Sequence, residues 1–251
     1  MSNRFVASFL AALALGGADA LAADKTVELL TLEWPPYTAS TLSGGGATTS
    51  IVRKAFEAAG YQVKVAFLPW KRAVEMVSEA SNTPVAFFPG YHCKQKEGLV
   101  ASEAVGDGPI GFAENVEAPL AWSSLDDLDG KRIGTVIGYS NTEEFDARAA
   151  EGRIKPEAAA DDVTNLRKLA NKRLDAVVID KFVFEYMRKK DAGLAESRGK
   201  LAFNGKPLKT NTLFVCARGD AAGTQLIQDL NTGLRTLDIN ALTKDYFDKA
   251  L

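Results

Sequence analysis

VELLTLEWPPYTASTLSGGGATTSIVRKAFEAAG, residues 27–60, predicts a strand, a loop and a helix in succession. The apolar run at 27–32 indicates a buried strand. Apolar residues at 51, 52, 55, 56 and 59 share one face of a 3.6-residue period, which predicts a helix over Thr48–Ala59. Thr48 or Thr49 suits the N-cap of this helix, and Gly60 suits a left-handed C-terminal cap.

The loop inside this stretch is the best candidate for a binding site in the sequence. It contains Trp34-Pro35-Pro36-Tyr37 and three consecutive glycines. In an open α/β sheet, ligands bind at the loops that leave the carboxyl ends of strands. Prolines stiffen such a loop, and glycines let backbone N–H groups approach a ligand. Trp34 and Tyr37 are therefore candidate ligand contacts, and packing of the loop onto its own half is the alternative.

Strands and helices alternate along the rest of the chain. Further strands are predicted at 61–68, 84–88, 131–137, 174–179 and 212–217. Further helices are predicted at 71–80, 141–150, 182–187, 224–237 and 241–250. Gly106-Asp107-Gly108-Pro109 predicts a turn, followed by a connecting strand at Ile110–Ala113.

This alternation indicates an α/β fold, because strands joined through helices form parallel sheets with helices on both faces. The last strand and the last two helices are too few for a third domain, so we assign them to the first sheet. We expect residues 1–22 to be a signal peptide, residues 23–112 plus 206–251 to form lobe 1, and residues 113–205 to form lobe 2. The chain then crosses between the lobes through hinge strands near residues 112 and 205.

The N-terminus has the pattern of a cleaved secretory signal. Arg4 precedes an apolar run over Phe5–Leu15, and Ala20-Leu21-Ala22 follows it. The run is too short for a membrane span, which needs about 20 apolar residues. We expect cleavage after Ala22 or Ala23 and a monomeric, exported protein, periplasmic in a diderm bacterium.

Composition excludes several classes of function. The chain has 251 residues, is 46% hydrophobic and carries a net charge of −2, so it lacks the basic surface that nucleic-acid binding needs. Cys93 and Cys216 are the two cysteines, and an oxidising compartment favours a disulfide between them over two buried thiols. His92 is the only histidine and has no partner at metal-ligand spacing, so we expect no metal and no cofactor.

Several segments, taken in order, resemble a known family. They are Trp34-Pro35-Pro36-Tyr37, Pro69-Trp70, Ser124–Gly134, Gly138-Tyr139-Ser140 and Asp175–Asp180. The chain resembles the extracellular solute-binding proteins of ABC importers, of the polar amino-acid-binding type. The resemblance implies a two-lobed periplasmic-binding-protein fold that closes on a small polar solute and delivers it to a membrane permease.

The sequence departs from that family at one position. Family members that bind α-amino acids usually carry an arginine that pairs with the ligand carboxylate, and the matching position here is Gln95. Lysine and glutamine do not grip a carboxylate in the bidentate way of a guanidinium. An ordinary α-amino acid is therefore in doubt as the ligand, and Lys94 and Arg72 are the possible anion partners.

The candidate ligand-binding residues all follow predicted strands or open predicted helices. They are Trp34, Tyr37, Trp70, Tyr91, Tyr139, Ser140, Asn141, Thr142 and Asp180. The resemblance implies that Asp180 takes a ligand ammonium group, and a helix N-cap is the alternative. The free N–H groups near Ser140–Thr142 suit an anion, with plain helix capping as the alternative.

Two other functions are compatible with the same fold. The first is a periplasmic enzyme resembling cyclohexadienyl dehydratase, in which Glu33 or Asp180 would transfer a proton. The sequence contains no G-x-S-x-G motif, no zinc-ligand pair and no phosphate loop, so we do not expect an enzyme. The second is a ligand-sensing accessory protein.

Overall fold

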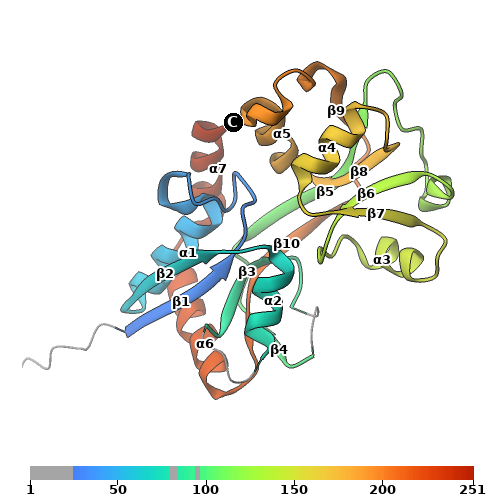
Figure 1. The fold of residues 1–251 in the computed structure, drawn as a ribbon. Helices are drawn as coiled ribbons and strands as arrows, with labels where there is room; N and C mark the ends of the chain where they lie inside the picture. Colours follow the sequence, from blue (N-terminus) through green and yellow to red (C-terminus); the bar gives the residue numbers. More distant parts are fainter. Residues whose placement is uncertain (1–24, 80–83, 94–96) are drawn as a thin grey trace, which may run out of the picture.

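The computed structural model describes residues 25–79, 84–93 and 97–251, so the predicted signal peptide lies outside the described residues. Figure 1 shows two α/β halves with the strands β5 and β10 running between them. The two-lobed fold predicted from the sequence is thereby confirmed. No helix in the described ranges is long and apolar enough to cross a membrane.

The first half is built on a mostly parallel sheet. Its strands are β1 (Lys25–Thr31), β2 (Tyr61–Phe67), β3 (Ala86–Gly90), the short β4 (Leu99–Ala101) and part of β10 (Lys209–Arg218). β1 pairs with β2 and β3 in parallel, and β10 pairs antiparallel with β3 and β4. Its helices are α1 (Ala47–Ala58), α2 (Trp70–Ser78), α6 (Ala221–Leu234) and α7 (Ile239–Ala250).

The second half repeats this plan. Its strands are β5 (Gly106–Asn115), β6 (Arg132–Val136), β7 (Lys155–Ala159), β8 (Ala176–Asp180) and β9 (Leu201–Phe203). β6 pairs in parallel with β7 and β8, whereas β5 is antiparallel to β8, β9 and β10. Its helices are α3 (Glu143–Ala150), α4 (Asp162–Ala170) and α5 (Lys181–Lys190).

The stretch at 27–60 folds as predicted, except at the start of its helix. α1 begins at Ala47, its N-cap is Gly46 with a φ of 103°, and neither predicted threonine caps it. A β-carbon at Gly46 would lie 2.4 Å from the carbonyl oxygen of Tyr37, so a side chain is excluded there. The tight return of the loop onto the aromatic segment therefore decides where the helix starts. Gly60, with a φ of 81°, adopts the predicted left-handed conformation.

The prediction of a turn at 106–109 is wrong, because these residues form the first part of β5. They pair with Thr210–Leu213 of β10. Gly108 is needed for close packing, since a β-carbon there would lie 2.8 Å from Oδ2 of Asp180 and 3.0 Å from the ring of Tyr91. The glycine thus admits side chains from two other segments, which a local turn signal does not reveal.

The predicted disulfide between Cys93 and Cys216 is formed, with the two α-carbons 5.3 Å apart. It ties the segment after β3 to β10, two parts of the first half separated by 123 residues. Buried side chains also continue from one half into the other. Phe247 of α7 packs on Phe182 of α5, with ring centroids 4.8 Å apart, and on Tyr37 at 5.2 Å. The halves are therefore in close contact.

Candidate functional site

The Trp34–Tyr37 segment forms a rigid aromatic pair at the exit of β1. The backbone N–H of Trp34 donates to the carbonyl of Thr38, and the N–H of Tyr37 donates back to the carbonyl of Trp34. The two rings stack with centroids 4.5 Å apart and planes 19° from parallel. Both side chains are buried. This closed loop holds the Trp34 ring with one face against Tyr37.

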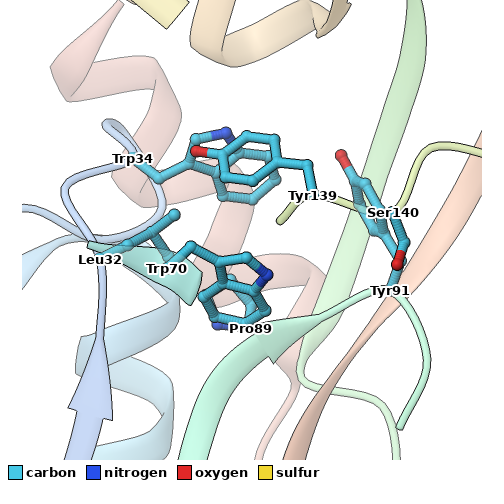
Figure 2. A pocket seen from close by; sticks show the side chains of 7 residues that line it. All are labelled: Leu32, Trp34, Trp70, Pro89, Tyr91, Tyr139 and Ser140. Atoms are coloured by element: carbon cyan, nitrogen blue, oxygen red, sulfur yellow. The ribbon is translucent and has the colours of Figure 1, made fainter. Parts of the chain in front are cut away.

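A small cavity lies against Trp34 and is lined from both halves of the molecule. Leu32, Trp34, Trp70, Pro89 and Tyr91 come from the first half, and Tyr139 and Ser140 come from the loop after β6 in the second. Its volume is about 30 Å³, room for about two water molecules. Figure 2 shows Trp34, Trp70 and Tyr139 on one side of the view and Tyr91 and Ser140 on the other.

Five of the nine candidate ligand-binding residues line this cavity. They are Trp34, Trp70, Tyr91, Tyr139 and Ser140. Contacts behind the cavity hold the rings in place: Trp70 packs edge-on against Phe87 at 5.2 Å, and Tyr91 packs edge-on against Trp34 at 5.9 Å. Leu32 and Pro89 were not among the candidates. Their only sequence signal is their position at the ends of β1 and β3.

Tyr37 and Asp180 meet behind the cavity. The Tyr37 hydroxyl donates to Oδ2 of Asp180 at 3.2 Å and to the backbone carbonyl of Asp107 at 3.0 Å. Asp180 also caps α5, accepting the N–H groups of Phe182 and Val183 through Oδ1. Burial raises the pKa of Asp180 to about 8, although these hydrogen bonds oppose the shift. Burial first, and then the Asp180 charge, hold the pKa of Tyr37 well above its ordinary value.

A second buried carboxylate, Asp162, was missed by sequence reasoning. The Tyr139 hydroxyl donates to its Oδ2 at 3.5 Å. Burial, and then the nearby charge of Asp161, raise the pKa of Asp162 to about 7. Asp161 caps α4 by accepting the N–H of Thr164 at 2.7 Å. Of these two adjacent aspartates, only Asp161 caps the helix.

The structure does not bring Asn141 and Thr142 to the cavity. Thr142 caps α3 by accepting the N–H of Phe145 at 3.1 Å. The backbone N–H and side-chain amide of Asn141 both donate to Asp146, each at 2.9 Å, and its carbonyl accepts the Asn211 amide at 3.1 Å. Their polar groups thus fix the loop that carries Tyr139 and Ser140.

Of the two possible anion partners, only Arg72 belongs to the described residues, and it does not line the cavity. Arg72 is exposed on α2, and Lys94 lies outside the described residues. No lysine, arginine or histidine of the described ranges is among the residues that line the cavity. Glu33 is exposed and accepts the backbone N–H of Ser40 at 3.1 Å, so its carboxylate faces away from the site.

The second half lies close to the first at Gly138. A β-carbon at Gly138 would lie 3.0 Å from Cβ and 3.3 Å from Cα of Lys71, at the start of α2. Gly138 also has a φ of 83°, a conformation that suits glycine. The loop that presents Tyr139 therefore closes directly over the helix that presents Trp70.

Comparison with known proteins adds information on the fold. No protein-family model matches the sequence, and no curated protein matches it. Three similar solved structures each match at least 90% of this chain. The GluR0 ligand-binding core from Nostoc punctiforme, in complex with L-glutamate, shares 18% identity with a TM-score of 0.69 over 90% of this chain and 99% of that one.

A histidine kinase sensor domain similar to periplasmic binding proteins shares 17% identity, with a TM-score of 0.73 over 91% of this chain and 96% of that one. The substrate-binding protein AbpA of an amino acid ABC transporter from Streptococcus pneumoniae, bound to L-arginine, shares 13% identity with a TM-score of 0.69, over 90% and 95% of the two chains. At these identities the likeness is one of fold. The resemblance expected from the sequence is confirmed at that level: the chain has the two-lobed fold of the periplasmic binding proteins.

Proposed function

We propose that this protein is a solute-binding protein that holds a small polar solute between its lobes and presents it to the membrane permease of an ABC importer. The observation that carries the proposal is the cavity at Trp34, which residues from both halves line. A solute in that position contacts both lobes only when they are together. It therefore favours the closed state by its differential affinity, which is the general mechanism of lobe closure.

The lobe boundaries at residues 112 and 205 belong to this proposal. Their support is the pairing of β5, which changes partner along its length. Its first residues pair with β10, and the residues from Ile110 onward pair with β8. A bend of β5 and β10 near this change would open the cavity and leave both sheets intact.

Tryptophan fluorescence tests solute binding directly. Trp34 and Trp70 line the cavity, whereas the third tryptophan, Trp122, packs on Phe112 away from it. In a Trp122→Phe background the emission comes from the two cavity residues. Titration with a library of small polar solutes should shift that emission for at least one compound. Small-angle scattering should then show a change in radius of gyration with the same compound, and a library with no active compound would reject the proposal.

Export is a separate part of the proposal, supported by the signal pattern over residues 1–22. Fractionation of cells that express the full chain should place the mature protein in the periplasm. Amino-terminal sequencing should begin at Ala23 or Asp24. A full-length protein in the cytoplasm would contradict export.

A second candidate function is ligand sensing, favoured by the similarity to a histidine kinase sensor domain. A gene for a permease and a gene for an ATPase beside this one would support import, and a signalling gene there would support sensing. The structure offers less to the enzyme alternative, because Glu33 is exposed and hydrogen-bonded outside the cavity and Asp180 is not among the residues that line it.

A further inference from the structure

The cavity is walled by aromatic rings and carries no charged side chain among the residues that line it. Its lining consists of two indoles, two phenols, a leucine, a proline and a serine. The face of an aromatic ring carries negative charge density, so it attracts a cation placed over it. Several rings around one small space add to this attraction.

Two buried carboxylates accept hydroxyl groups from tyrosines at the cavity or next to it. Asp162 accepts the hydroxyl of Tyr139, which lines the cavity. Asp180 accepts the hydroxyl of Tyr37, whose ring stacks on Trp34. Asp162 and Asp180 are each only 2% exposed. Among the described residues, no lysine, arginine or histidine forms an ion pair with either one.

Helix capping accounts for only part of this arrangement. Asp180 caps α5 through Oδ1, and Oδ2 is directed to Tyr37. Asp162 is not a cap, because Asp161 already fills that role for α4. A buried carboxylate without a cationic partner is costly to ionise, and burial raises the pKa of Asp162 to about 7 and that of Asp180 to about 8. A positive charge in the cavity would favour the ionised form of both acids, whereas an anionic group would favour the protonated form.

The lining also bears on the kind of cation. A primary ammonium group carries three N–H donors, and leaving them unpaired in a buried site is costly. The side chains lining the cavity offer hydroxyl acceptors only at Ser140, Tyr91 and Tyr139, and Tyr139 already donates to Asp162. A fully alkylated ammonium has no N–H to satisfy and presents methyl groups to the rings. Aromatic walls therefore suit it better than they suit a primary amine.

We infer that the solute is a small alkylated ammonium cation held in the aromatic cage of Trp34, Trp70, Tyr91 and Tyr139, with Asp162 and Asp180 supplying the opposite charge behind it. The inference rests on the proposed function and specifies its solute class. The cavity of about 30 Å³ is smaller than such a cation, so the lobes must stand further apart in the bound state than in this structure. Asp162 is a charge-supplying residue that acts through the ring of Tyr139.

Isothermal titration calorimetry with matched probes at pH 9, above the pKa of both buried acids, tests the inference. The probes are tetramethylammonium, choline, the neutral choline analogue 3,3-dimethylbutan-1-ol, L-arginine and L-glutamate. Choline should bind at least tenfold more tightly than its neutral analogue, because only the charge differs in that pair, and tetramethylammonium should also bind. Both amino acids should bind more weakly than the cations, because each brings a carboxylate into the field of the two buried acids.

Two variants separate the charge effect from loss of structure. Asp162→Asn should weaken binding of the cations by about tenfold and leave the weak binding of the neutral analogue unchanged. Asp161→Asn is the matched control, because it changes the neighbouring exposed cap and should leave all affinities within about twofold. Circular dichroism of each variant should match the parent, which excludes misfolding as the cause.

The outcomes distinguish the inference from the proposed function. Equal binding of choline and its neutral analogue, or loss of affinity in the Asp161 variant as great as in the Asp162 variant, would overturn the inference. Closure on an amino acid and not on the cations would also overturn it, while keeping the solute-binding function. Absence of closure with every compound of the wider library would reject the proposed function itself.

Discussion

Replacement of Asp162 by asparagine should raise the free energy of unfolding, relative to the wild type, by more at pH 8 than at pH 5. The carboxyl has its pKa raised from 3.8 to about 7 in the folded protein by burial, and then by the charge of Asp161. The groups that face it are the hydroxyl of Tyr139 and, further off, Tyr91 and Asp180. The folded state therefore holds a proton that the unfolded state has lost between these two values, and stability falls as the pH rises through that range.

The size of the effect follows from the shift. Between pH 5 and pH 7 the folded protein keeps this proton while the unfolded chain does not, and two pH units correspond to about 3 kcal/mol. Asparagine is neutral at every pH and avoids this loss. The difference in free energy of unfolding between the variant and the wild type should thus increase by about 3 kcal/mol between pH 5 and pH 8. The 3.5 Å hydrogen bond from Tyr139 is long, so its loss subtracts little.

Urea unfolding followed by circular dichroism measures this difference. Wild type, Asp162→Asn and Asp161→Asn are compared at both pH values without reductant. The Asp161 variant should differ from wild type by less than about 1 kcal/mol at both, because asparagine is an equally good cap. If the difference between Asp162→Asn and wild type is the same at pH 5 and pH 8, the carboxyl is not held neutral by burial, and the reasoning fails.

Other substitutions probe closure, the disulfide and the packing of the first half. Gly138→Ala should open the lobes, seen as a larger radius of gyration in scattering, whereas Gly130→Ala, with a similar φ of 75° but no neighbouring atom within 4 Å, should not. Reduction of the Cys93–Cys216 bridge should lower the free energy of unfolding by about 5 kcal/mol in urea, given its 123-residue separation; a double alanine variant should be insensitive to reductant. Gly233→Ala should cost about 1–3 kcal/mol, because its β-carbon would lie 1.9 Å from a backbone oxygen of α1; unchanged stability would show that α6 shifts freely.

Local patterns in the chain were enough to predict most of the helices and strands. The 3.6-residue period in 47–58 and the alternation in 61–67 depend only on neighbours in sequence, because the apolar face of each element must be buried. The order of these elements also predicted the two-lobed fold and the aromatic loop after β1. Trp34, Trp70 and Tyr91 were identifiable for that reason: each stands at the carboxyl end of a strand.

Only the tertiary structure decided which of these residues are in contact and what electrostatic environment each one has. Tyr37 and Asp180 are 143 residues apart and touch only because the halves close. Asp162 looks like its exposed neighbour Asp161 in sequence, yet it is buried. Whether a carboxylate stays exposed to solvent depends on segments that pack over it from elsewhere in the chain. A local sequence pattern does not indicate which distant segments will do so. The same holds for Gly108, whose missing side chain makes room for Tyr91 and Asp180 rather than for a turn.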